Sequence, residues 1–418
     1  MAKIKILHLI TDLATGGAEI MLQKVLSQVD RSQFLNTVVS MTDAGSLGKQ
    51  IEALQIPVFT LGLRRGIPNP LAVIRLVRLL RAERPHILQT WLYHSDLLGL
   101  VAGKLSRVPV IAWNVRCSDM NLQHYPRLTG VVLRALVRLS RLPEIVIFNS
   151  NAGWRFHQSL GYDPRRWMVI PNGFDLDEFY PDSEARFSFR REIRLPPEAV
   201  VVGLIARYDP MKDHQNFLRA VASVLEQRRE IRFVLIGHGV DESNRELVAE
   251  IRNYNLSPHV HLLGARADVR KIMPALDVVV LSSAYGEGFP NVLGEAMASG
   301  IPCIVTNVGD AAAVVGDTGR VVNARDAAEL AVAIAEIVDM PHEERRSLGR
   351  AARRRIERYF SLPSVVGQYE LLYKQLAADL ADYPSSNSLH WRRRFRPDHT
   401  IARGSETLHQ DGRDKTDF

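Results

Sequence analysis

Short runs of aliphatic and β-branched residues alternate with longer amphipathic segments through the first 174 residues of the chain. The short runs have the pattern of strands and the amphipathic segments have the pattern of helices. The expected strands cover residues 5–10, 37–41, 58–61, 86–91, 108–113, 145–149 and 168–170. Because strands that alternate with helices form βαβ units, this half of the chain predicts a parallel sheet.

A second series of the same kind follows a polar, charge-rich stretch at 175–197. Its expected strands cover residues 200–206, 232–237, 260–264, 278–282 and 304–306. The predicted fold class is therefore α/β, with two doubly wound parallel-sheet domains at 1–174 and 175–355, joined by the turn-rich segment Pro171-Asn-Gly-Phe-Asp175. Residues 356–383 predict a helix, and the polar tail at 384–418 is expected to be disordered.

Cysteine content and the apolar stretches limit the class of protein. The 418 residues include two cysteines, Cys117 and Cys303, too few for a disulfide framework or a cysteine-rich zinc site. The first apolar run contains His8 and Asp12, so we expect no signal peptide. The longest apolar stretch, 97–113, is interrupted by two cations and a proline and cannot cross a bilayer as one helix. We therefore expect a cytoplasmic protein.

Positive charge is concentrated in the first half. Residues 1–174 hold 21 Lys and Arg against 10 Asp and Glu, whereas the rest of the chain holds 32 against 36. Two amphipathic segments carry arginines at helical spacing, namely Arg75, Arg78 and Arg81, and Arg134, Arg138 and Arg141. Such helices can rest on anionic lipid, which suggests peripheral contact with the inner face of the cytoplasmic membrane. A solvated basic face explains either helix equally well.

The pair Gly16-Gly17 lies between the first strand and an amphipathic helix that begins near Glu19. Glycine at this position lets backbone amides and the start of a helix approach a phosphate. A tight turn is an equally good explanation, and the full Gly-x-Gly-x-x-Gly pattern of a dinucleotide site is absent from the sequence.

Further candidates follow the strands of the second half. Arg207 and Lys212 come after the expected strand 200–206, and open α/β sheets bind ligands at the carboxyl ends of their strands. A diphosphate needs such cations for binding and for stabilising charge as it leaves; a solvated loop is the alternative. Gly237 and Arg266 follow the next two strands, where glycine permits close approach of the backbone and arginine can lie beside a nucleobase.

The most specific pattern runs from Glu287 to Glu295, where a glycine-rich loop opens a helix. Backbone amides near residues 291–293 can hold a phosphate, and the two carboxylates can accept hydrogen bonds from sugar hydroxyls. Asp175 and Asp177 match the short Asp-x-Asp pattern that holds a divalent metal in many transferases. They follow a turn rather than a buried strand, so chance explains the match and no metal site is expected.

The order of these motifs resembles family 4 of the retaining glycosyltransferases over residues 3–375. The resemblance implies the GT-B fold, in which two Rossmann-like domains face a cleft and the last helix, here 363–381, returns to the first domain. It implies a UDP- or GDP-linked sugar as donor, a saccharide or lipid-linked saccharide as acceptor, and a role in cell-surface polysaccharide biosynthesis. Neither a metal nor another cofactor is expected, and no nucleic-acid partner.

The resemblance also assigns roles to residues. Arg207 and Lys212 would contact the donor diphosphate, Glu295 the ribose and Glu287 the transferred sugar. Gly16 and Gly17 would face the phosphates from the first domain. The remaining donor-binding residues would be Gly237, Arg266, Phe289, Pro290, Asn291, Val292 and Leu293.

His94 is the candidate for the histidine near the transferred sugar. The same motif can also be aligned on Trp91, and a core or capping histidine explains His94 nearly as well. No carboxylate of the first domain stands out as a nucleophile, which agrees with a front-face mechanism in which the departing phosphate helps to deprotonate the acceptor; a double displacement would need such a carboxylate.

Two other classes of protein remain as alternatives. A nucleotide-sugar epimerase of related architecture would also need phosphate-binding cations and a hinge. A basic protein that binds nucleic acid or membrane without catalysis would account for the isoelectric point near 9.5. Its basic residues are not interleaved with aromatic residues as in known nucleic-acid modules.

Overall fold

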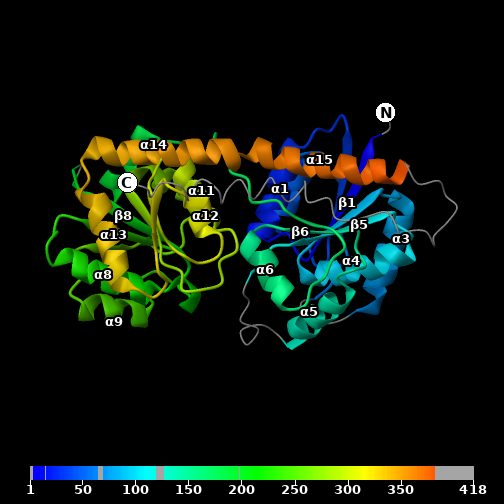
Figure 1. Ribbon diagram of the computed structural model, residues 1–418, viewed down its shortest axis with the longest axis horizontal. Helices are drawn as coiled ribbons and strands as arrows, with labels where there is room; N and C mark the ends of the chain where they lie inside the picture. The colour runs from blue at the N-terminus through cyan, green and yellow to red at the C-terminus, as the bar shows by residue number, and fades with distance from the viewer. Residues whose placement is uncertain (1–2, 15, 65–68, 119–126, 197, 382–418) are drawn as a thin grey trace, which may run out of the picture. The chain divides into compact units, whose positions relative to one another are not determined.

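The computed structural model describes residues 3–14, 16–64, 69–118, 127–196 and 198–381. These residues form two compact units (Figure 1). Unit 1 contains the described residues of 1–116 and 121–170 together with residues 366–381, and unit 2 contains the described residues of 171–365 with a short stretch at Cys117. The tail expected to be disordered, 384–418, lies outside the described residues.

Unit 1 is built on a seven-stranded sheet in the order β3-β2-β1-β4-β5-β6-β7, and all neighbouring strands are parallel. The strands are β1 (Ile4–Ile10), β2 (Phe34–Ser40), β3 (Val58–Thr60), β4 (Ile87–Trp91), β5 (Val110–Val115), β6 (Ile145–Phe148) and β7 (Trp167–Val169). The helices are α1 (Gly17–Gln28), α2 (Gly45–Ala53), α3 (Pro70–Glu83), α4 (Tyr93–Leu105), α5 (Arg127–Leu139) and α6 (Asn151–Ser159). The strand order reverses between β1 and β4, where doubly wound sheets bind ligands.

Unit 2 has a six-stranded parallel sheet in the order β10-β9-β8-β11-β12-β13, with its reversal between β8 and β11. The strands are β8 (Val201–Ile205), β9 (Arg232–Ile236), β10 (Val260–Leu262), β11 (Val278–Leu281), β12 (Cys303–Thr306) and β13 (Gly319–Val322). The helices are α7 (Ser183–Glu192), α8 (His214–Leu225), α9 (Arg245–Asn253), α10 (Val269–Ile272), α11 (Asn291–Ala298), α12 (Ala311–Val315), α13 (Ala327–Asp339) and α14 (His342–Tyr359), with short 3₁₀ helices η2 (Pro210–Lys212) and η3 (Met273–Ala275).

The predicted α/β class with two parallel doubly wound sheets is confirmed, and the differences are local. Strand β13 was not predicted, because its four residues include a glycine and an arginine and give little apolar signal. Strand β5 begins at Val110 rather than at 108, since Pro109 cannot donate to a neighbouring strand. The helix expected at 356–383 corresponds to the end of α14 and to a separate helix, α15 (Leu362–Ala381), and the two helices are separated near Phe360.

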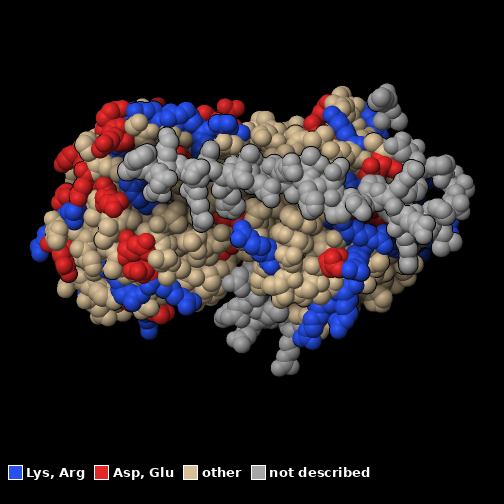
Figure 2. All heavy atoms as spheres, in the orientation of Figure 1, with Lys and Arg blue, Asp and Glu red and all other residues tan. Residues whose placement is uncertain are grey.

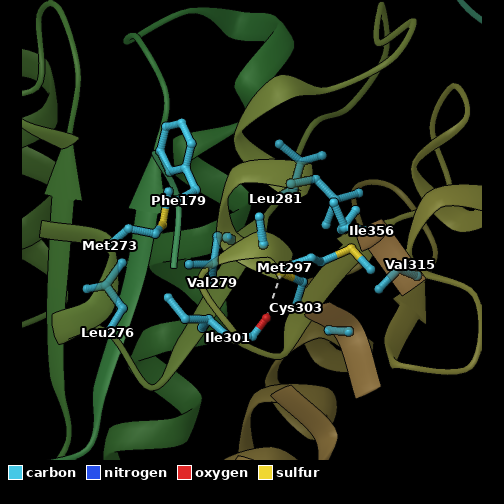
Figure 3. Packing of buried hydrophobic residues seen from close by; sticks show 14 of the residues in the cluster. Phe179, Met273, Leu276, Val279, Leu281, Met297, Ile301, Cys303, Val315 and Ile356 are labelled. Atoms are coloured by element: carbon cyan, nitrogen blue, oxygen red, sulfur yellow. Dashed lines mark hydrogen bonds between the residues drawn. The ribbon is translucent and has the colours of Figure 1, made fainter. Parts of the chain in front are cut away.

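The sheet of unit 2 has a hydrophobic cluster on each face: one lies against α8 and α13, and the other lies under α11 and α14 (Figure 3). Side chains of β11 and β12, including Val279, Leu281 and Cys303, meet Met297 of α11 and Ile356 of α14. These side chains are almost fully buried. Packing of this density holds the strand ends and the start of α11 in fixed positions.

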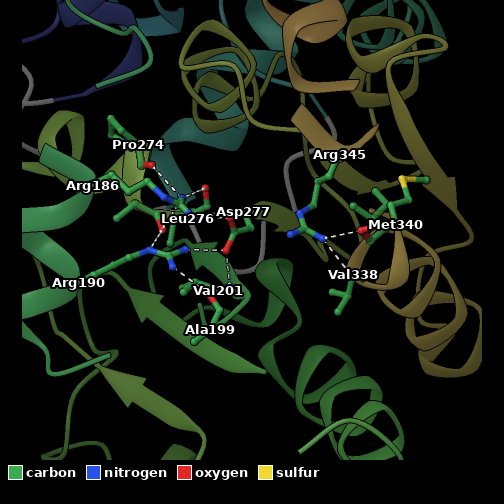
Figure 4. Close-up of polar contacts among 12 residues, drawn as sticks. Arg186, Arg190, Ala199, Val201, Pro274, Leu276, Asp277, Val338, Met340 and Arg345 are labelled. Carbon is green, nitrogen blue, oxygen red and sulfur yellow. Dashed lines mark hydrogen bonds and ion pairs between the residues drawn. The ribbon is translucent and has the colours of Figure 1, made fainter. Parts of the chain in front are cut away.

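A buried ion cluster ties α7 to the sheet of unit 2 (Figure 4). Asp277, just before β11, accepts hydrogen bonds from Arg186 at 2.7 Å and from Arg190 at 2.6 Å, and its second oxygen also accepts the backbone amide of Val201 at 2.8 Å. Arg190 and Asp277 are 5% and 7% exposed. Because every partner is satisfied, this cluster is a structural clamp rather than a candidate site.

The helix expected to return to the first domain is α15, and its residues from Val366 onward belong to unit 1. Tyr373 donates to Gln89 at 2.6 Å, and the hydroxyl of Tyr369 accepts from Asn114 at 3.0 Å. Both tyrosines are fully buried. This part of the prediction is confirmed. Among the described residues no helix is long and apolar enough to span a membrane.

Candidate active site

The reversal of strand order in unit 2 brings the ends of β8 and β11 side by side, and the segments that follow these strands carry the predicted donor residues. After β8 the chain reaches η2, whose first turn is capped by the carboxylate of Asp209 on the amide of Met211 at 2.9 Å. Lys212 is the last residue of η2. The hydroxyl of Ser282, which follows β11, donates to the carbonyl of Lys212 at 2.8 Å and joins the two segments.

Lys212 and Glu287 form an ion pair through the ammonium group and Oε1 of the carboxylate. Their side chains are 14% and 8% exposed, so the pair is largely withdrawn from water. The buried hydroxyl of Ser283 donates to the same oxygen of Glu287 at 2.6 Å. The structure therefore brings one predicted cation and one predicted carboxylate together, and adds Ser283, which no sequence motif marks.

The backbone of Glu287 rests on the segment that follows β12. Gly309 has a φ of +64°, and its α-carbon faces the Glu287 backbone so closely that a Cβ there would lie 2.7 Å from the Glu287 carbonyl carbon. The amide of Asp310 donates to the carbonyl of Gly288 at 3.0 Å. At the end of β12, Thr306 donates to the carbonyl of Ser283 at 2.6 Å. The loop that carries Glu287 is thus held from two sides.

Helix α11 begins at Asn291, as the glycine-rich loop predicted, and its N-cap residue Pro290 supplies no side-chain hydrogen bond to the first turn. The amides at the start of α11 therefore lack a side-chain cap, which leaves room for an anionic acceptor. Glu295 lies within α11 and is half-buried.

The junction at 171–175 supports this helix and is more than a linker. Asn172 donates to the side-chain oxygen of Asn291 at 2.5 Å. The ring of Phe174 lies against Gly294, where a Cβ would come within 2.5 Å of the ring atom Cε1, and is stacked on Phe289 with ring centroids 6.1 Å apart. This role is not visible in the sequence, because nothing in a Pro-Asn-Gly-Phe-Asp turn shows which helix it will support.

The other residues of unit 2 that were predicted to bind the donor follow strand ends and differ in how tightly their neighbours hold them. Arg207 is 59% exposed and pairs with Asp209 at 3.0 Å. Gly237 follows β9, and its α-carbon touches the end of β8, where a Cβ would lie 2.9 Å from the amide nitrogen of Arg207. Arg266 pairs with both Glu192 and Asp268, and these hydrogen bonds raise its pKa. Arg266 is therefore held in place by two carboxylates.

The Asp175-x-Asp177 match has a local explanation. Asp175 accepts the backbone amide of Asp177 at 2.9 Å and that of Glu178 at 3.3 Å, and so closes a turn. Among the described residues, no three His, Cys, Asp or Glu side chains come close enough together to hold a metal ion.

Gly16, Gly17 and His94 belong to unit 1. Gly16 is the N-cap of α1, which starts at Gly17, and the buried carboxylate of Glu19 lies next to the α-carbon of Gly16. A carboxylate already occupies part of the space at this helix start. His94 lies in the first turn of α4, after β4, and burial lowers its pKa below 6.5.

Comparison with known proteins identifies the family. Residues 185–355 match the family described as glycosyl transferases group 1, and residues 15–178 match the family described as glycosyltransferase family 4. An Escherichia coli relative, UDP-Gal:alpha-D-GlcNAc-diphosphoundecaprenol alpha-1,3-galactosyltransferase, is 28% identical over 73% of this chain and 80% of its own. A Campylobacter jejuni relative, N,N'-diacetylbacillosaminyl-diphospho-undecaprenol alpha-1,3-N-acetylgalactosaminyltransferase, is 27% identical over 62% of this chain and 70% of its own.

Solved structures show the fold. The crystal structure of Anabaena HepE in complex with UDP matches with a TM-score of 0.74 and 23% identity, over 91% of this chain and 100% of that one. The two parallel sheets and the returning helix α15 are therefore those of the GT-B fold. From the two family matches, which cover most of the chain, and from this fold, the protein is a glycosyltransferase that belongs to family 4, the glycosyl transferases group 1.

Proposed function

We propose that this glycosyltransferase moves a sugar from a UDP- or GDP-linked donor to a saccharide or lipid-linked saccharide in cell-surface polysaccharide biosynthesis. Transfer would retain the anomeric configuration and would need no metal ion. The relatives from Escherichia coli and Campylobacter jejuni support this proposal, because their names specify undecaprenol-linked acceptors and alpha linkages.

The observation that carries the proposal is the buried pair of Lys212 and Glu287 at the reversal point of the second sheet. The carboxylate of Glu287 neutralises the ammonium group of Lys212. A bound diphosphate would offer Lys212 a stronger anionic partner and would leave Glu287 free to accept hydrogen bonds from sugar hydroxyls. Arg207, with its side chain 59% exposed, can add a second cation. Two cations at the diphosphate can supply the charge that a metal supplies in other transferases.

In this proposal the remaining residues keep the roles that the family resemblance implies. Glu295 would accept hydrogen bonds from the ribose, and the uncapped amides at residues 291–293 would hold the phosphate and sugar. Phe289 and Pro290 would line the same loop. Gly237 would allow the nucleotide close to the end of β8, and Arg266 would lie beside the base.

Donor binding can be tested by thermal denaturation with UDP, GDP and ADP and their sugars. A ligand that binds only the folded protein stabilises it by an amount that depends on occupancy. We expect one nucleotide to raise the melting temperature, Lys212→Ala to abolish the rise, and Lys271→Ala, at an exposed lysine on α10, to preserve it. A full response in Lys212→Ala would refute the diphosphate contact. The anomeric configuration of the product, read by NMR, and activity in excess EDTA test retention and metal independence.

Product analysis also separates the alternatives. An epimerase would release an altered nucleotide sugar without any acceptor, and a nucleic-acid-binding protein would show salt-sensitive binding to nucleic acid and no response to nucleotide sugars.

Unit 1 offers a surface that would suit contact with an anionic membrane. Exposed apolar side chains occur on three helices that pack side by side, α3, α4 and α5: Leu71, Ile74, Val101, Leu105 and Val131. Arg78, Arg81, Arg134 and Arg138 are exposed on the same helices, and Figure 2 shows Lys and Arg gathered over this side of unit 1. Apolar side chains among cations suit an anionic bilayer surface, because the apolar side chains can contact lipid tails and the cations can contact the negative headgroups.

Cosedimentation with phosphatidylglycerol vesicles tests this contact. Val131→Glu should weaken sedimentation, whereas Val332→Glu on α13 of unit 2 should not; the two valines are 56% and 59% exposed. Equal sedimentation of both variants would show that α5 does not contact lipid. Phosphatidylcholine vesicles should sediment less of the unaltered protein, because they lack the negative charge.

A further inference from the structure

The connection between β4 and α4 consists of one residue, Leu92, in an unusual conformation. Its φ is +76° and its ψ is 155°. This region is open to glycine and strongly disfavoured for a residue with a Cβ, and residues that stay there are held by their surroundings. The amide of Leu92 donates to the carbonyl of Asn114 at 3.2 Å, and the carbonyl of Leu92 accepts the amide of Asp96 at 2.9 Å. Strain of this kind is concentrated where a protein needs one particular backbone geometry.

The strained conformation of Leu92 is enforced by the close packing of α4 on the sheet. Gly99 and Gly103 lie one turn apart on α4 and face the sheet. A Cβ on Gly99 would lie 3.2 Å from Leu9, and one on Gly103 would lie 2.8 Å from Ile111. With glycines at both positions the helix approaches the sheet more closely than side chains would allow, so a single residue must turn the chain.

The first turn of α4 is anchored by every residue except His94. The three anchors are Tyr93 Oη with His157 Nε2 at 2.6 Å, Ser95 Oγ with Thr11 Oγ1 at 3.1 Å, and Asp96 Oδ1 with the hydroxyl of Thr90. Tyr93, Ser95 and Asp96 are buried, whereas His94 is half-buried and its side chain makes no hydrogen bond to the part of the chain that the structure describes. His94 therefore lies on a turn whose other three residues are fixed by side-chain hydrogen bonds.

We propose that Asp96 is a positioning residue for His94, which it orients by fastening the strained first turn of α4 to Thr90 of β4. The inference rests on the proposed function, with His94 as the histidine that the family resemblance implies near the transferred sugar. Asp96 itself is fully buried and does not reach the solvent-facing side of the turn.

The protonation state of Asp96 is consistent with this positioning role. Burial raises the pKa of Asp96 to about 8, although the hydroxyl of Thr90 and the backbone amide of Asn114 act in the opposite direction. The carboxyl group is then largely neutral at pH 7. A neutral group can serve as a hydrogen-bonding anchor in the interior without placing a negative charge beneath the histidine.

The test replaces Thr90 by valine, which has the same shape and lacks the hydroxyl. We expect kcat for sugar transfer to fall about tenfold or more while KM for the nucleotide sugar stays within about twofold, because Lys212, Glu287 and Glu295, the groups proposed to bind the donor, are in unit 2. Thr90→Ser should recover most of kcat. Thr318→Val is the matched control, since the Thr318 hydroxyl donates to the carbonyl of Val315 at 2.7 Å in a buried part of unit 2.

Two results separate this inference from the function on which it rests. If Thr90→Val lowers kcat no more than Thr318→Val does, with a similar loss in melting temperature, the hydroxyl has only a structural role and the inference is wrong. If His94→Ala transfers sugar normally, the role of His94 in the proposed function is wrong as well. Loss of activity in His94→Ala together with full activity in Thr90→Val would overturn the positioning role alone.

Discussion

Replacing Gly309 by alanine should disturb Glu287 without altering any polar group of the site. Gly309 has a φ of +64°, and a Cβ at this position would lie 2.7 Å from the carbonyl carbon and 3.0 Å from the Cβ of Glu287. Contacts between such atoms are favourable only at about 3.5–4.0 Å. The Glu287 segment must therefore move by roughly 1 Å.

The energetic cost has two parts. A side chain in the left-handed region costs about 1–2 kcal/mol, and insertion of a methyl group against packed backbone costs about 1–3 kcal/mol more. Gly264→Ala isolates the first part, because Gly264 is also in unit 2, has a φ of +63°, and its Cβ would meet nothing closer than 3.6 Å. We expect Gly309→Ala to lower the free energy of unfolding by about 2–5 kcal/mol and Gly264→Ala by about 1–2 kcal/mol.

Urea denaturation and steady-state kinetics check both parts. A displacement of about 1 Å at a positioned group can lower kcat about 100-fold. Gly309→Ala should therefore lose more activity than the fraction of unfolded protein accounts for. The shift of Glu287 would also weaken its pair with Lys212. Equal unfolding free energies for the two variants, or unchanged transfer by Gly309→Ala, would refute the reasoning that Gly309 supports Glu287.

Three further predictions concern buried titratable groups. Asp277→Asn should lower the free energy of unfolding by about 3–5 kcal/mol in urea denaturation, because it leaves the buried guanidinium of Arg190 without its anion. A loss below about 1 kcal/mol would contradict the structural role of this ion cluster. Burial lowers the pKa of His8, His157 and His214 to about 4, so these histidines take up protons more readily in the unfolded chain. The free energy of unfolding should therefore fall as the pH drops from about 6.5 to 4, by up to about 1.4 kcal/mol per pH unit for each histidine. A free energy of unfolding that stays constant over this pH range would argue against their burial. Burial raises the pKa of Asp96 to about 8, so stability should decline as the pH rises from about 4 to 8, and Asp96→Asn should remove that part of the slope in melting curves measured across this range.

Much of the candidate site could be predicted from local pattern. Glu287 and Glu295 stand out because a glycine-rich loop that opens a helix is a local feature, and α11 starts at Asn291 as expected. Arg207 and Lys212 follow a strand that periodicity alone reveals. Residues such as Ser283 and Thr306 could not be found in this way, because an isolated hydroxyl gains significance only from the carboxylate or carbonyl that it meets.

By itself, the sequence determined the element types, the parallel α/β class and the positions of the chemically active loops, because hydrophobic period and glycine placement act over a few residues. Only the tertiary structure decided which groups lie together. The pairing of Lys212 with Glu287 spans 75 positions, and the support of Gly294 by Phe174 joins a turn to a helix far along the chain. The strain at Leu92 was also decided by the tertiary structure. It follows from how closely α4 packs on its sheet and not from any local preference of leucine.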